Sequence, residues 1–120
     1  MIDHLSIHVS DMASSKRFYE AALKPLGYTL MMDFGDQAVG LGEGGKPDFW
    51  LSKGAPQPSH IAFRSPDRTT VDAFHAAAIA AGGKDNGPPG LRARYHPGYY
   101  GAFVLDPDGY NVEAVCHQAP

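Results

Sequence analysis

Two stretches of the chain align without a gap, "HLSIHVSDMASSKRFYEAALKPLGY" (residues 4–28) and "HIAFRSPDRTTVDAFHAAAIAAGGK" (residues 60–84). The alignment brings identical residues together, His4 with His60, Asp11 with Asp67, Phe18 with Phe74 and Gly27 with Gly83. A shared register of histidine, aspartate, phenylalanine and glycine indicates an internal repeat rather than chance. We therefore predict two copies of one structural unit, about residues 2–52 and 58–117, joined by "KGAPQPS" within a single domain that spans residues 1–120.

Each copy has the pattern of one strand, one helix and three further strands. In the first copy "HLSIHV" alternates, a helix runs from Ser10 or Asp11 to "KPLGY", and strands follow around "YTLMMDF", "QAVGLG" and "DFWLS". In the second copy "HIAFRS" precedes a helix that opens with "SPD", a less regular stretch over residues 84–94, and the strands "YYGAFVL" and "YNVEAV". Period-two alternation predicts the strands. We expect an α+β fold of two tandem β-α-β-β-β modules, in which a cupped, mostly antiparallel sheet carries the helices on its outer face.

The composition excludes several classes of function. The formal net charge is −3 with the histidines neutral, so no basic field would attract nucleic acid. No apolar run approaches the ~20 residues of a membrane span, and "MIDHLSIHVS" lacks the pattern of a signal peptide. Cys116 is the only cysteine, so no intrachain disulfide can form. We expect a cytoplasmic protein with neither a nucleic-acid nor a membrane partner.

Alternation along three strands places one carboxylate and two imidazoles on the faces opposite the apolar ones. In "LDPDGYNVEAV" (residues 105–115), Glu113 lies among apolar residues of a strand, where a carboxylate is costly unless something pairs with it. His4 and His60 lie opposite the apolar faces of the two opening strands. If helices cover the apolar faces, all three side chains point into a common concavity. Two imidazoles and one carboxylate suit a divalent metal ion that keeps open coordination positions.

Other polar and aromatic residues are candidates for catalysis and substrate binding. His8 shares the face of His4 and is a candidate general base, substrate contact or replacement ligand, or else a passive residue of the cavity. The loop "RYHPGYYG" (residues 94–101) supplies an arginine fork for a carboxylate or phosphate, or is a solvated loop whose tyrosines pack at a sheet edge. Trp50 either stacks on a ligand or packs against a second subunit. The candidate substrate-binding residues are Ser6, Trp50, Arg64, Arg94, Tyr99 and Tyr100.

The two modules and the hairpin before Glu113 resemble the vicinal oxygen chelate superfamily, which includes glyoxalase I, fosfomycin-resistance thiol transferases, extradiol dioxygenases and bleomycin-resistance proteins. The segment "DPDGYNVE" (residues 106–113) is similar to the family's "DPDG" hairpin before a ligand carboxylate. The resemblance covers nearly the whole chain and implies metal ligands at His4 ("IDHLSI"), His60 ("PSHIAF") and Glu113. Glyoxalase I uses a further carboxylate in the first module, where this chain has Trp50, which cannot ligate a metal. The resemblance thus implies a two-His, one-Glu centre for Zn, Ni, Mn or Fe(II).

The resemblance leaves three functions open. The first is a metal-dependent lyase, isomerase or transferase, with Glu113 and His8 in its catalytic centre, that acts on a small molecule chelating through neighbouring oxygens. The second is an Fe(II) extradiol-type dioxygenase with the same three ligands. The third is a metal-free protein that binds a small molecule such as a drug, as bleomycin-resistance proteins do. Because small members of the family are commonly homodimers, we also expect a homodimer, with each site built from one chain or shared between two.

Overall fold

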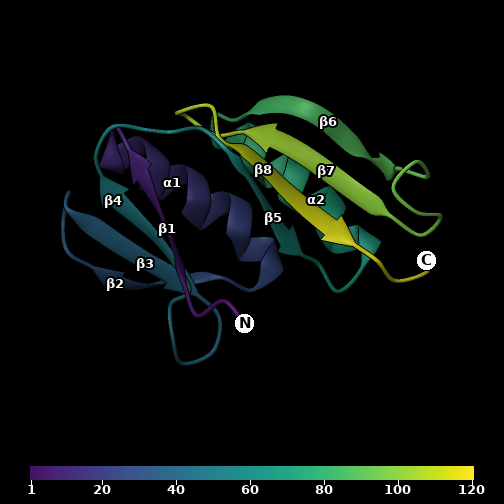
Figure 1. Cartoon of the computed structure of the whole chain (residues 1–120), viewed down its shortest axis with the longest axis horizontal. Coiled ribbons are helices and arrows are strands. Elements are labelled where there is room, and N and C mark those ends of the chain that lie inside the picture. The colour runs from purple at the N-terminus through teal and green to yellow at the C-terminus, as the bar shows by residue number, and fades with distance from the viewer.

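The computed structural model covers residues 1–120 and contains the β-α-β-β-β unit twice (Figure 1). Module one comprises β1 (Leu5–Val9), α1 (Met12–Leu23), the short 3-10 helix η1 (Lys24–Leu26), β2 (Thr29–Asp33), β3 (Ala38–Gly42) and β4 (Phe49–Lys53). Module two comprises β5 (His60–Arg64), α2 (Arg68–Ala80), β6 (Lys84–Leu91), β7 (Tyr100–Leu105) and β8 (Asn111–Cys116). The predicted α+β fold of two tandem modules is confirmed, and the irregular stretch after the second helix is the strand β6.

The strands form two four-stranded sheets with the same internal order, β1-β4-β3-β2 in module one and β5-β8-β7-β6 in module two. The opening strand of each module pairs in parallel with the closing strand, and the other pairs are antiparallel. Ser6 lies opposite Trp50 in β4, and Ala62 lies opposite Glu113 in β8. The repeat offset that aligns His4 with His60 also aligns Ser6 with Ala62. Trp50 and Glu113 therefore occupy equivalent places in the two sheets.

Both helices begin at the aspartates that the repeat aligned. The Asp11 carboxylate accepts a hydrogen bond from the Ala13 N–H at 3.1 Å, and the Asp67 carboxylate accepts one from the Thr70 N–H at 2.7 Å. Each carboxylate satisfies an N–H group that the first helical turn leaves without a partner. Gly27 ends η1 with a φ of 89°, a conformation that favours glycine. No helix of the chain has the length and hydropathy that crossing a membrane requires.

One hydrophobic core extends through both modules, because α1 packs against α2 as well as against its own sheet (Figure 1). Phe18 of α1 and Phe74 of α2 are fully buried in this core. The Phe49 and Phe63 rings meet edge to face across the module boundary, with centroids 5.3 Å apart. The helix-facing sides of both sheets therefore share one interior.

The hairpin between β7 and β8 fastens module two to module one. Its Asp106 carboxylate accepts a hydrogen bond from the Tyr19 hydroxyl of α1 at 2.5 Å. The Tyr110 hydroxyl donates to the His8 carbonyl of β1 at 2.7 Å. The predicted "DPDG" turn is present, with the Gly109 N–H bonded to the Asp106 carbonyl at 3.0 Å and a φ of 92° at Gly109. The turn thus precedes β8 directly and links module two to α1 and β1 of module one.

Candidate functional site

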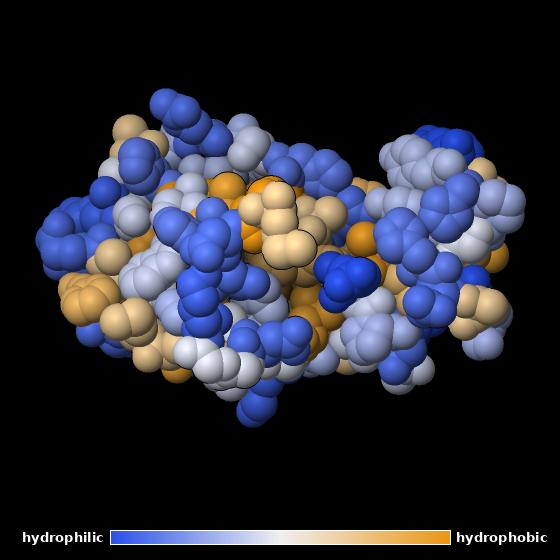
Figure 2. Space-filling model, turned by 60° about the horizontal axis from the view of Figure 1, so that its bottom comes forward, coloured by the Kyte–Doolittle hydropathy of each residue, from blue (hydrophilic) through white to orange (hydrophobic).

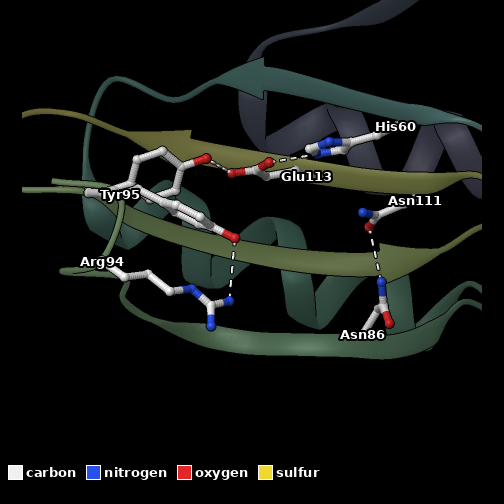
Figure 3. A network of polar contacts seen from close by, with 7 residues as sticks. His60, Asn86, Arg94, Tyr95, Asn111 and Glu113 are labelled. Carbon is white, nitrogen blue, oxygen red and sulfur yellow. Dashed lines mark hydrogen bonds and ion pairs between the residues drawn. The ribbon is translucent and has the colours of Figure 1, made fainter.

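The side chain of Glu113 is 1% exposed and lies at the centre of a small polar cluster on the sheet of module two (Figure 3). Its Oε1 atom lies 2.7 Å from His60 Nε2, and its Oε2 atom accepts a hydrogen bond from the Tyr99 hydroxyl. Both carboxylate oxygens of Glu113 thus lie within hydrogen-bonding distance of a neighbouring side chain, His60 on one side and Tyr99 on the other. The burial of Glu113 is therefore balanced by two donors on the side of the sheet that faces away from α2.

A glycine on the neighbouring strand makes room for this cluster. A Cβ atom at Gly101 would lie 3.2 Å from Glu113 Oε2 and 3.2 Å from Tyr99 Cε1. With hydrogen in its place, the Tyr99 ring can lie over the carboxylate. Burial, and then the hydrogen bond to Glu113, raise the pKa of Tyr99 well above its usual value. Tyr99 therefore stays protonated and remains a hydrogen-bond donor to Glu113 at neutral pH.

A cavity of about 460 Å³ opens over Glu113. Its other lining residues are His60, Tyr95, His96, Tyr99 and Phe103. Three of these are aromatic rings of tyrosine and phenylalanine, so the wall is flat and largely apolar, with the carboxylate and two imidazoles as its polar groups. Such a combination suits a small planar molecule with a polar edge.

A second cavity, of about 310 Å³, lies between β1 and β5. Ser6 and His8 line it from module one, and His60 and Tyr110 line it from module two. His60 belongs to both cavities, with a side chain that is 52% exposed. The predicted site residues Ser6 and His8 thus come close to His60, although neither lines the cavity of Glu113.

His4 does not join His60 and Glu113 within one chain. It precedes β1, is exposed, and its Nδ1 atom lies 2.7 Å from a carboxylate oxygen of Asp3. No three His, Cys, Asp or Glu side chains in the structure lie close enough together to hold a metal ion. Strand alternation fixed the face from which each imidazole projects. It did not fix the separation between β1 and β8, which belong to different sheets.

The other predicted substrate-binding residues are dispersed. Trp50 stacks on Phe34 in module one with ring centroids 6.3 Å apart, and Arg64 is exposed at the end of β5 without an ion pair. Arg94 lines a neighbouring cavity beside Tyr95. Tyr100 departs from the expectation, because its hydroxyl donates to Asp72 of α2 at 2.7 Å.

The reason for the difference at Tyr100 is that β7 begins there, as the predicted strand "YYGAFVL" indicated, whereas the candidate role of Tyr100 assumed that it belongs to the loop of residues 94–101. Successive strand residues point to opposite faces, so Tyr100 is directed toward the helix while Tyr99, just before the strand, reaches Glu113.

Four residues of the site were not among the predicted site residues, namely Tyr95, His96, Gly101 and Phe103. Phe103 lies directly opposite Glu113 in the register of β7 and β8. Alternation along "YYGAFVL" places Gly101 and Phe103 on one face, so the sequence contained the signal for both. His96 lies in the loop, where no periodicity applies, and its Nε2 atom lies 2.8 Å from His117 Nδ1.

The largest cavity of the molecule, about 870 Å³, lies elsewhere, between α1 and the residues after β2. Two of its charged residues satisfy each other, since Lys16 Nζ lies 2.7 Å from an Asp33 carboxylate oxygen. It contains no histidine and no aromatic residue. The smaller cavity over Glu113, which has histidine and aromatic side chains in its lining, is therefore the better candidate for a functional site.

The sequence matches the Glyoxalase/Bleomycin resistance protein/Dioxygenase superfamily over residues 1–114, and the chain belongs to this superfamily. The structure is similar to that of a glyoxalase/bleomycin resistance protein from Albidiferax ferrireducens T118, with 29% sequence identity, a TM-score of 0.78 and coverage of 95% of this chain and 96% of the other. A hypothetical protein from S. aureus is 25% identical, with a TM-score of 0.70 and coverage of 94% of each chain.

A glyoxalase/bleomycin resistance protein/dioxygenase family enzyme from Burkholderia phytofirmans PsJN shares the fold, with 18% identity, a TM-score of 0.74 and coverage of 98% of each chain. No curated protein matches the sequence.

Proposed function

We propose that the protein is a metal-dependent enzyme of this superfamily, acting on a small molecule that chelates through neighbouring oxygens. The observation that carries the proposal is Glu113, a carboxylate that is 1% exposed yet lies beside an open cavity with His60 Nε2 at 2.7 Å. A metal ion held here would replace the hydrogen bond between the two side chains, and a carboxylate oxygen and an imidazole nitrogen are ligands that suit Zn²⁺, Ni²⁺, Mn²⁺ or Fe²⁺.

One chain supplies only two of the three expected donors, so a single copy does not fit a three-ligand centre. We propose that the protein is a homodimer in which His4 of a second copy completes the site. His4 lies in the segment "MIDHL", where Ile2 is 83% and Leu5 is 41% exposed. Apolar side chains so exposed favour burial against another surface, and Figure 2 shows apolar residues around a hollow on one face of the molecule.

The residues of this chain have distinct roles in the proposed site. Glu113 supplies one negative charge, and His60 and His4 supply neutral nitrogen donors. A divalent ion held by them would act as a Lewis acid for an oxyanion of the substrate, an effect of several kcal/mol. Tyr99 holds the second oxygen of Glu113 and thereby orients the carboxylate. His8, across the second cavity from His60, is the candidate general base.

Metal content tests the proposal directly. Protein purified without chelator should contain a divalent metal by elemental analysis, and Glu113→Gln should lower the metal affinity by at least about 100-fold, because it removes the only anionic ligand. The matched control is His75→Ala, which removes a histidine that also contacts a carboxylate, Asp85 at 2.9 Å, from a position on α2. The control should retain the metal. Wild-type protein that binds no divalent metal would contradict the proposal.

Mixing two inactive variants tests whether the site is shared. Neither His4→Ala nor Glu113→Gln alone should bind metal well. If each site takes His4 from one chain and Glu113 from the other, subunit exchange between the two variants restores one intact site per mixed dimer, about a quarter of all sites. No recovery after exchange, or a monomeric mass in light scattering, would contradict the shared site.

A metal-free binding protein is the alternative, and one observation favours it. Both oxygens of Glu113 already have hydrogen-bond donors within one chain, Tyr99 and His60. The carboxylate is thus satisfied without an ion. Wild-type protein that stays metal-free at millimolar Zn²⁺ or Mn²⁺, while Glu113→Gln leaves its fold intact, would establish this alternative.

A further inference from the structure

Another cavity, of about 300 Å³, adjoins the cavity of Glu113 and shares Tyr95 and Phe103 with it. Arginine and asparagine side chains give it its polar lining, namely Arg92, Arg94, Asn86 and Asn111, and no carboxylate lines it. Figure 3 shows Arg94 and Asn86 on the β6 side of this region, with Glu113 and His60 on the other side of the Tyr95 ring. The two cavities therefore adjoin at Tyr95 and Phe103, one with a carboxylate in its lining and the other with two arginines.

Neither arginine of this region pairs with a carboxylate. Arg92 Nη2 donates to the Pro88 carbonyl at 2.7 Å, and the guanidinium lies 5.5 Å from the centre of the Phe103 ring. Arg94 Nη2 donates to the Tyr95 hydroxyl at 3.3 Å, and its guanidinium lies 5.1 Å from the centre of that ring. These hydrogen-bond partners are neutral, and the only nearby carboxylate that Arg92 influences is Asp85, whose pKa the hydrogen bond with His75 lowers most and Arg92 helps to lower without forming an ion pair with it.

Asp85, the acidic residue closest in sequence to the two arginines, already has other hydrogen-bond partners. Asp85 Oδ1 lies 2.9 Å from His75 Nε2 and accepts from the Gly87 N–H at 3.0 Å. Three lysines of module one, by contrast, each pair with an aspartate, Lys16 with Asp33, Lys46 with Asp3 and Lys53 with Asp36. The arginine pair in module two keeps donors available for a ligand.

Two glycines of β6 hold Arg92 in its place. A Cβ atom at Gly87 would lie 3.2 Å from Arg92 Nη2, and one at Gly90 would lie 3.1 Å from Arg92 Nη1. The guanidinium group therefore lies close to both glycines, and a side chain at either position would make it shift. The two glycines of "GPPGLRAR" (residues 87–94) thus leave room for the Arg92 side chain beside the strand.

We propose that the substrate is a planar molecule with an oxyanion group, a carboxylate or a phosphate. The oxyanion is held by Arg92 and Arg94, because guanidinium groups match both groups with paired N–H donors. The planar body lies against the rings of Tyr95 and Phe103, which both cavities share. The part that reacts then faces Glu113 and His60. The placement of the reacting part rests on the proposed function, whereas binding of the oxyanion by the two arginines requires no metal.

The test uses the full chain after treatment with chelator and measures the binding of three matched probes, benzoate, benzamide and phenyl phosphate. Benzoate and benzamide share a ring and differ in charge. We expect benzoate to bind at least about tenfold more tightly, as charge-assisted hydrogen bonds to arginine require. Phenyl phosphate distinguishes the two oxyanions, since the tighter of the two anionic probes identifies the natural group.

Arg92→Gln and Arg94→Gln should each remove most of the preference for the anion. Arg17→Gln is the control, because Arg17 is an equally unpaired arginine on the exposed face of α1, and it should leave all three affinities unchanged. If Arg92→Gln fails to fold, the same comparison is made with Arg94→Gln alone, because Arg94 is exposed and its replacement should not disturb folding.

The proposal is overturned if benzoate and phenyl phosphate bind no more tightly than benzamide, or if the preference survives Arg94→Gln. Because the protein is metal-free in this experiment, the result is independent of the metal content measured above. An intact anion preference in a protein that never binds metal would refute the proposed enzyme and leave the anion site standing.

Discussion

The inner faces of the two modules carry different chemistry on the same backbone. In module one, Trp50 stacks on Phe34 with an angle of 12° between the rings and closes over Gly40. In module two, the equivalent position is Glu113, bonded to His60 and to Tyr99. The repeat therefore fixes which positions face away from the helices, and the residue at one position decides whether the face is an aromatic surface or a polar site.

Both modules use a glycine on the adjacent strand to admit an aromatic ring. A Cβ atom at Gly40 would lie 3.0 Å from the Trp50 ring, and one at Gly101 would lie 3.2 Å from Tyr99. In module one the ring belongs to the closing strand itself. In module two the ring comes from the loop before β7, so its hydroxyl can reach the carboxylate. Both modules therefore have a glycine on the strand next to the closing strand. They differ in which segment supplies the aromatic ring that packs on this glycine.

The largest effect on stability is expected for Trp50→Ala. This variant removes the half-buried ring that stacks on Phe34, and it should lower the free energy of unfolding by about 2 kcal/mol. Trp50→Phe keeps an aromatic surface and should lose less than half as much. Unfolding has to be followed by circular dichroism, because Trp50 is the only tryptophan of the chain. If Trp50→Ala were as stable as wild type, the stacking of Trp50 on Phe34 would not contribute to the stability of module one.

A smaller effect is expected for Gly101→Ala. The added methyl group meets Glu113 Oε2 and Tyr99 Cε1, so the ring should shift and the hydrogen bond to Glu113 should break, at about 1 kcal/mol of unfolding free energy. The pKa of Tyr99, read from phenolate absorbance against Tyr99→Phe, should fall toward its usual value. Burial remains as the larger cause, so the fall is partial.

Gly45→Ala is the control for Gly101→Ala, because a Cβ atom there meets nothing within 4 Å. Stability should stay within about 0.5 kcal/mol of wild type. If Gly101→Ala also leaves both stability and the Tyr99 pKa unchanged, the ring does not depend on this glycine, and the parallel with Gly40 fails.

The smallest effect concerns the hairpin that joins the modules and is a pH dependence. Burial raises the pKa of Asp106, against the opposing hydrogen bonds from Tyr19 and from the N–H groups of Tyr110 and Asp108. A carboxyl whose pKa is higher in the folded than in the unfolded state binds more protons when folded. Its contribution to stability is therefore complete below a pH of about 4 and is lost as the pH rises through the folded pKa.

Asp106→Asn removes this titration while keeping the size of the side chain. Chemical denaturation of both proteins across the acidic range should show the stability of wild type falling relative to Asp106→Asn as the pH rises. A difference that stays constant, or that changes in the opposite direction, would mean that the hairpin carboxylate is not desolvated at the module boundary.

The sequence predicted the elements of the fold well, for reasons that are local. Strand alternation and the aspartates at the helix starts act over a few residues, so "HLSIHV", Asp11 and Asp67 were sufficient to place them. The partner of Glu113 was also accessible, because His60 and Glu113 lie on adjacent strands of one module. Alternation along the predicted strand "YYGAFVL" also directs Tyr100 away from Glu113, but its candidate role as a substrate contact assumed that it belongs to the loop of residues 94–101.

What the sequence determined by itself is the repeated unit, the alternation of side chains along each strand, and the choice of His60 and Glu113 as candidate site residues. What only the tertiary structure decided is the relation between modules. His4 precedes β1 and contacts Asp3 rather than Glu113, and Arg92 comes to lie beside the Phe103 ring. The physical reason is that periodicity fixes a side chain relative to its own strand. The distance between two sheets is set by how α1 packs on α2 and by the hairpin at Asp106.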